Sequence, residues 1–198
     1  ETRLNIAMDI FSASGGIVGG DRFSKALRAD SGISYSPSAY FNPELTYPDI
    51  GVGVFNMSFQ SNNERLIEAV KLAETTYQDF MTKGASVSEI QRASIALQNR
   101  TLASEQTIFD RAYSFINDLA QGILPEITSI KSFLLKIKNQ SEPHLVNKTI
   151  HSLSEYPCVP ILVIIGNPSP ENLESLKALP FIDDVKLKAY KEIIEELN

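Results

Sequence analysis

Two side chains that can donate hydrogen bonds stand seven residues apart, on either side of a glycine. Arg28 falls in the last turn of a predicted helix, and Tyr35 falls on the strand predicted to follow the turn at Gly32. A guanidinium offers five N–H donors and a phenol offers one O–H donor. Brought together across the turn, the two groups would suit a carbonyl or a carboxylate. The spacing also fits purely structural roles, because an arginine in a last helical turn interacts favourably with the helix dipole and tyrosine is common in strands.

The other residues with chemical potential do not combine into a motif. His144 and His151 are separated by about two helical turns, or ~10 Å, which is too far for them to share one zinc ion without other ligands. We expect capping or surface roles for both. The glycine-rich residues 15–20 follow a predicted helix and lack the Gly-Lys-Ser/Thr ending of a P-loop, so a connector is favoured over a nucleotide site. The lone Cys158 cannot form an internal disulfide and is expected to be a small buried side chain.

The composition is that of an ordinary globular protein. The chain has 198 residues, of which 43% are hydrophobic and 21% charged, and its formal net charge is −6. This length suits one domain over residues 1–198, with roughly the last thirty residues forming a C-terminal extension. The acidic balance, without a basic cluster, argues against nucleic-acid binding. The longest apolar run, residues 160–166, is too short to span a membrane.

The first third of the chain predicts two helices followed by two strands. Apolar spacing places helices at residues 4–13 and 22–30, the second capped by Asp21 and closed by Gly32. Residues 33–57 are rich in Tyr, Val, Ile and Phe, and they predict two extended strands joined by a turn over residues 42–49. The residues expected to face the core from the two helices are Ile6, Ala7, Ile10 and Phe11, then Phe23, Ala26 and Leu27.

The rest of the chain predicts mainly helices. A capping box of Ser61 with Glu64 begins a helix over residues 64–83, and a second box, Ser86 with Glu89, begins the next. Their inward stripes are Leu66, Val70, Ala73, Tyr77 and Phe80, then Ile90, Ala93 and Leu97. Further helices are expected at 107–121, 127–137, 141–153 (capped by Ser141) and 170–179, with a buried strand at 159–165 and a weakly specified tail at 186–197. Grouped helices with hairpin strands predict an α+β fold, in which helices pack on one face of an antiparallel or mixed sheet.

Residues 20–36, GDRFSKALRADSGISYS, resemble the C-terminal-repeat signature of the pitrilysin/insulinase zinc peptidases. That signature has a small-residue loop, an Arg-Leu-like pair, Leu-Arg, an acidic or polar pair, Gly, an apolar residue, a small residue and Tyr. Phe23 replaces the usual leucine after Arg22. Residues 145–166 are also similar to the closing helix and strand of this family, and the order of elements matches to about Pro168.

The resemblance implies an α+β half-domain with ferredoxin-like elements, one of two homologous halves that close like a clamshell. In the family, the N-terminal half binds zinc on an HxxEH motif plus a distant Glu, and the C-terminal half supplies an Arg and a Tyr. These map onto Arg28 and Tyr35, implied to bind the peptide backbone and, for Tyr35, to donate a hydrogen bond to the oxyanion. The expected function is the C-terminal half of a zinc metalloendopeptidase, with zinc bound by an N-terminal half or partner subunit and not by this chain.

Two features depart from the family pattern. The sequence has no HxxEH motif, and it opens at the first helix without the strand that the family places before it. The chain alone is therefore expected to be inactive. The alternative is a non-catalytic homologue that acts as a scaffold or a peptide-binding subunit. The substrate, the compartment and the oligomeric state stay open.

Overall fold

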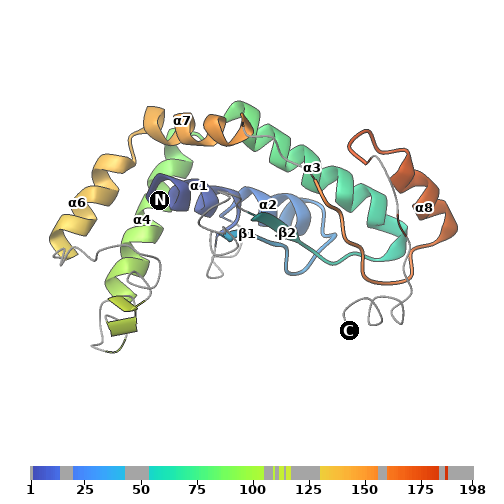
Figure 1. The fold of residues 1–198 in the computed structure, drawn as a ribbon, viewed down its shortest axis with the longest axis horizontal. Helices are drawn as coiled ribbons and strands as arrows, with labels where there is room; N and C mark the ends of the chain where they lie inside the picture. The colour runs from blue at the N-terminus through green and yellow to red at the C-terminus, as the bar shows by residue number, and fades with distance from the viewer. Residues whose placement is uncertain are drawn as a thin grey trace.

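The computed structural model describes residues 2–13, 20–42, 54–104, 109, 112–113, 115–116, 130–155, 160–182 and 186. Within these residues the chain is mostly helical and has one two-stranded antiparallel sheet, which fits the α+β class (Figure 1). The helices are α1 Thr2–Phe11, α2 Arg22–Ser24, α3 Leu66–Lys83, α4 Val87–Ser104, α6 Ile130–Gln140, α7 Pro143–Ser154 and α8 Pro170–Lys177. The strands are β1 Ser38–Asn42 and β2 Val54–Ser58. The structure also has a wide helical segment, the π-helix η1 Lys25–Asp30, and a tight one, the 3-10 helix η3 Asn63–Arg65.

Helix α1 is central and contacts α4, α7 and β1 (Figure 1). Its predicted apolar face is confirmed, since Ile6, Ala7, Ile10 and Phe11 are all buried. The ring of Phe11 stacks on that of Phe23, with centroids 5.3 Å apart, so α1 and α2 share one aromatic core. This core holds α2 in place, and α2 leads directly into η1.

Helices α3 and α4 meet at a sharp turn that the sequence predicts correctly. Gly84 ends α3 with φ 67°, a conformation that other residues rarely adopt. The predicted capping box of the next helix is confirmed: the Ser86 N–H donates to Glu89 Oε2 at 2.8 Å, and the Glu89 N–H donates to Ser86 Oγ at 3.3 Å. The predicted core residues of α4, which are Ile90, Ala93 and Leu97, are buried.

The β1–β2 hairpin packs one face on the helices. Its register pairs Ala39 with Met57 and Phe41 with Phe55. Ala39 is buried whereas the neighbouring Tyr40 is 52% exposed, as expected when alternate side chains of a strand point to opposite faces. The described sheet therefore has only two strands and is smaller than the sheet of a complete α+β layer.

Two predicted helix caps are wrong. Asn62, not Ser61, caps the segment leading into α3, because its Oδ1 accepts the Arg65 N–H at 3.0 Å. Ser141 does not cap α7; its hydroxyl donates to the Ile137 carbonyl of the preceding helix instead. Pro143 does occupy the first turn of α7, where its missing N–H costs little.

The predicted buried strand at 159–165 is also wrong for the residues described. Residues 160–165 form no strand, and Ile161, Val163 and Ile165 are 82%, 73% and 96% exposed. Only Ile164 packs against a hydrophobic cluster, a small one that joins α3 to α8 through Leu66 and Leu176. An apolar run predicts burial, but this run leaves most of its side chains at the surface.

Several expectations fall on residues outside those described. These are Cys158, the glycines at 15, 16 and 19, residues 43–49 of the expected turn, residues 51–53 of the second expected strand, most of the helix expected at 107–121, and the tail after residue 186. Within the described part of the chain, no helix combines the length and the apolar character needed to cross a bilayer.

Candidate functional site

Arg28 and Tyr35 lie against each other at the surface. The guanidinium carbon of Arg28 sits 4.4 Å from the centroid of the Tyr35 ring, within the range of a cation–π contact. Tyr35 is 77% exposed and Arg28 is half-buried, so the pair faces solvent and not the core. The structure therefore brings together the two residues on which the sequence-based hypothesis depends.

The chain reverses direction between them at Gly32. The last turn of η1 is wide, since the Ser31 N–H donates to the Ala26 carbonyl at 3.3 Å, and π-type turns of this kind are frequent at functional sites. The Gly32 N–H then donates to the Arg28 carbonyl at 3.0 Å, with φ 64° at Gly32. A left-handed residue at this position suits glycine, and the reversal carries Tyr35 back over the Arg28 side chain.

Tyr35 does not lie on a strand, contrary to the prediction. It occupies a bend, and β1 begins only at Ser38. Pro37 accounts for the difference, because proline has no N–H to donate to a sheet and is confined to edge, first or bulge positions in strands. The side chain of Tyr35 is therefore placed by the bend and by its contact with Arg28.

Ser34 holds the bend from inside. It is 3% exposed; its N–H donates to the Leu27 carbonyl at 2.9 Å, and its Oγ accepts the Gln60 N–H at 3.1 Å. The bend is thus bonded both to η1 and to the segment after β2. Sequence reasoning did not single out Ser34, nor Arg65, which reaches the same bend from η3. No local sequence signal identifies either one, since their partners lie 26 and 34 residues away.

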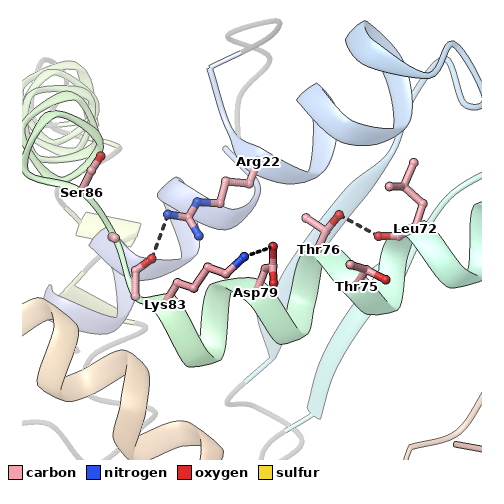
Figure 2. A pocket seen from close by; sticks show the side chains of 9 residues that line it. Arg22, Leu72, Thr75, Thr76, Asp79, Lys83 and Ser86 are labelled. Atoms are coloured by element: carbon pink, nitrogen blue, oxygen red, sulfur yellow. Dashed lines mark hydrogen bonds and ion pairs between the residues drawn. The ribbon is translucent and has the colours of Figure 1, made fainter. Parts of the chain in front are cut away.

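An open groove of about 600 Å³ lies beside α2 and the C-terminal half of α3 (Figure 2). Its charged side chains already have partners: Lys83 pairs with Asp79 at 2.7 Å, and Arg22 donates to the backbone carbonyl of Gly84 at 2.8 Å. Arg22 also makes a two-point ion pair with Glu89, at 2.7 and 2.9 Å, and this pair lowers the pKa of Glu89 to about 2 against the opposing effect of burial. We assign this groove a structural role, because Arg22 joins α2 to the α3–α4 turn through Gly84 and Glu89.

The two histidines do not form a metal site. His151 Nδ1 lies 2.9 Å from the Met81 carbonyl, and His144 is exposed in the first turn of α7. Among the residues that the structure describes, no three His, Cys, Asp or Glu side chains gather where they could hold one metal ion. These residues therefore do not fit a zinc site.

The sequence matches no protein-family model and no curated protein. Among solved structures, the chain is similar to the crystal structure of a peptidase M16 inactive domain from Pseudomonas fluorescens, with a TM-score of 0.60 and 16% sequence identity. The match covers 76% of this chain and 33% of that one, so this chain spans about a third of the length of its structural neighbour. At this identity the likeness concerns the fold: the chain has a peptidase M16-like fold.

Proposed function

We propose that this chain is a non-catalytic, peptide-binding domain with a peptidase M16-like fold, which binds extended polypeptide at Arg28 and Tyr35. The observation that carries this proposal is the exposed stack of the Arg28 guanidinium on the Tyr35 ring. The structural neighbour is itself an inactive domain of a peptidase M16, which supports the non-catalytic reading.

The stack leaves hydrogen-bond donors available. A ring that covers one face of a guanidinium does not block the N–H groups, which lie in the guanidinium plane. Among the described residues, no acceptor engages the Arg28 side chain, and Tyr35 is largely open to solvent. Two adjacent donors of this kind suit the carbonyl oxygens of an extended peptide, and this recognition does not depend on side-chain sequence.

The second candidate is the C-terminal half of a zinc metalloendopeptidase. The placement of Tyr35 favours it, because an exposed phenol beside a cation could donate a hydrogen bond to an oxyanion formed in a cavity shared with another half. The zinc would belong to an N-terminal half or a partner subunit, since the described residues of this chain do not fit it. Arg28 and Tyr35 would then bind and orient the peptide whose bond is cut.

Peptide binding is testable on the 198-residue chain. We expect fluorescein-labelled, dephosphorylated β-casein, an unfolded polypeptide, to gain fluorescence anisotropy when it is titrated with the chain, with a midpoint in the micromolar range or weaker. Arg28→Ala should weaken binding about 10-fold, as for one lost charge-assisted hydrogen bond. Arg92→Ala is the matched control, since Arg92 is an exposed arginine on α4. Absence of binding by the unmodified chain, or equal losses in the two variants, contradicts the proposal.

The two candidates differ in what the whole protein does. Hydrolysis of the labelled casein by the protein that contains this chain, measured before and after treatment with a chelator, separates them. No hydrolysis in either state supports the non-catalytic domain. Hydrolysis that the chelator abolishes, and that Tyr35→Phe lowers about 10²–10³-fold, supports the peptidase half instead.

A further inference from the structure

Arg65 reaches the Arg28–Tyr35 bend from a separate element. It is the last residue of η3, immediately before α3, and its Nη1 donates to the Ser31 carbonyl at 2.9 Å. Ser31 lies between Arg28 and the turn glycine, Gly32. A side chain 34 residues further along the sequence therefore bonds directly to the peptide group that begins the reversal.

The orientation of the Arg65 guanidinium is fixed by a second partner. Its Nε and Nη2 donate to the two carboxylate oxygens of Glu68, at 2.8 and 2.7 Å, three residues along the same helical segment. A two-point contact of this type restrains a guanidinium in the plane of the carboxylate. With two donors held there, the remaining Nη1 points at Ser31. Lysine could not serve both partners in this way, because an ammonium lacks the planar fork.

The Ser31 carbonyl is an effective place from which to set the bend. It belongs to the peptide plane between Ser31 and Gly32, so holding it restrains rotation about ψ of Ser31 and φ of Gly32. These are the two torsions that decide where the chain goes after the turn, and a shift in them changes the path to Tyr35. Ser34 restrains the other side of the bend through Leu27 and Gln60. Between these two anchors, Tyr35 is brought over Arg28.

We propose that Arg65, oriented by Glu68, is a positioning residue for the peptide-binding pair: it sets the geometry of the Arg28–Tyr35 stack through the Ser31 carbonyl without touching the peptide. This inference rests on the proposed peptide-binding function for its consequence. The geometric part, that Arg65 holds the stack, stands on the structure and can be tested separately.

The geometric test uses nuclear magnetic resonance of the full chain. A ring 4.4 Å from the guanidinium carbon should shift the Arg28 δ-proton resonances upfield through its ring current. Arg65→Met should move these resonances toward their values in unstructured arginine, while Lys83→Met should leave them unchanged. Lys83 is the control because it too forms a surface ion pair on α3, with Asp79, but it has no contact with the bend. Unchanged Arg28 resonances in folded Arg65→Met overturn the proposal.

The binding test uses labelled, dephosphorylated β-casein and a double-mutant cycle. Arg65→Met should weaken binding about five-fold in the otherwise unmodified chain, and should have a smaller effect when Arg28 is already alanine, because only the Tyr35 hydroxyl is then left to be positioned. Equal effects in both backgrounds would mean that Arg65 acts independently of the pair, which overturns the proposal. If the unmodified chain binds no casein, the proposed function fails, and the resonance shifts still decide the geometric claim.

A milder variant guards against misfolding. Glu68→Gln removes the carboxylate that orients Arg65 but changes only an exposed side chain, so the fold should persist. It should give smaller changes in the same direction, about two-fold in affinity and a partial shift of the Arg28 resonances. If Arg65→Met fails to fold, the absence of both changes in Glu68→Gln overturns the proposal.

Discussion

Arg22 and Glu89 form a two-point ion pair that joins α2 to the first turn of α4, across 67 positions of sequence. Arg22 uses a further N–H to bind the Gly84 carbonyl, and its guanidinium lies 5.3 Å from the centre of the Phe80 ring. Arg22 therefore connects α2, which leads into η1 and Arg28, to the turn between α3 and α4. The position of α2, and hence of η1 and Arg28 after it, depends on this connection.

The ion pair predicts how stability changes with pH. Arg22 lowers the pKa of Glu89 to about 2, below the value of about 4.3 expected in an unfolded chain. The pair therefore contributes stability above about pH 4.3, and this contribution is lost as the pH falls from there toward 2. Glu89→Gln should lower the free energy of unfolding by about 1–2 kcal/mol at pH 7, less than the full shift implies because the pair is partly exposed. Urea unfolding at several pH values measures this.

Glu174→Gln provides the control for the pH-dependent stability that the Arg22–Glu89 pair contributes. Glu174 also pairs with a basic residue, Lys177, but it is 75% exposed, and its loss should cost less than about 0.5 kcal/mol. The deficit of Glu89→Gln should shrink between pH 4 and pH 2, as the carboxyl group of the unmodified protein takes up its proton. A deficit that stays constant over this range would show that the pair does not carry the pKa shift.

Gly32 and Gly84, which both have a positive φ, should respond differently to alanine. At Gly84 a Cβ would come 2.5 Å from Asn147 Oδ1, whereas at Gly32 nothing lies within 4 Å. Asn147 is not free to move away, because it bonds both the N–H and the carbonyl of Ala85, at 2.7 and 3.0 Å. Gly32→Ala should cost about 1–2 kcal/mol from backbone strain alone. Gly84→Ala should cost about 2–4 kcal/mol, as the Asn147 bonds are also lost.

Urea unfolding of the two alanine variants under one set of conditions makes this comparison. Asn147→Ala removes the two hydrogen bonds to Ala85 and serves as the reference. Its loss of unfolding free energy should account for most of the difference between the two glycine variants. Equal losses at Gly32 and Gly84 would mean that the α3–α4 turn relaxes around the added methyl group. The two hydrogen bonds from Asn147 of α7 to Ala85 would then not hold the turn rigidly.

The sequence predicts the parts of this fold that depend on local spacing. The face of α1 that holds Ile6 and Phe11 repeats at helical intervals, and both residues are buried as expected. The box of Ser86 with Glu89 forms because both partners lie within one helical turn. Ser61 fails as a cap because Asn62 is one residue nearer to η3 and is an equally good capping residue, a choice that apolar spacing does not resolve.

The parts that the sequence does not predict are set by partners far along the chain. The arginine and tyrosine of the site are visible as a pair, but the anchors Ser34 and Arg65 are not, since their acceptors and donors come from other elements. The hydrogen bonds between Asn147 and the backbone of Ala85 likewise join residues that are 62 positions apart. The exposure of Ile165 is not predicted for the same reason. The residue type indicates that the side chain prefers burial, but it does not indicate which residues pack next to it.

The exposed apolar run predicts an uneven pattern of alanine effects. Ile164 packs against the cluster between α3 and α8, so Ile164→Ala should lower the free energy of unfolding by about 1 kcal/mol. Ile165 is 96% exposed, and Ile165→Ala should change it by less than about 0.5 kcal/mol. Because the two changes are chemically identical, thermal or urea unfolding isolates the effect of position. A loss at Ile165 as large as that at Ile164 would mean that this side chain is covered in solution.

Two substitutions at Tyr35 separate the ring from the hydroxyl. Tyr35→Phe keeps a ring face for the Arg28 guanidinium, so the free energy of unfolding should change by less than about 0.5 kcal/mol, and Tyr35→Ala should cost about 0.5–1 kcal/mol. Binding of the labelled, dephosphorylated casein should fall about 3- to 10-fold in Tyr35→Phe, as for one lost hydrogen bond. It should fall further in Tyr35→Ala, because Arg28 then loses its support as well.

Tyr113 offers the matched control, since it is another exposed tyrosine, 62% accessible. Tyr113→Phe and Tyr113→Ala should leave casein binding unchanged. If Tyr35→Phe binds as well as the unmodified chain while Tyr35→Ala does not, the phenol donates nothing to the peptide and serves only as a surface for Arg28. In that case backbone recognition rests on the guanidinium alone, whereas the oxyanion role is still decided by the hydrolysis rate of Tyr35→Phe, because the oxyanion forms only during the reaction and not in the bound peptide.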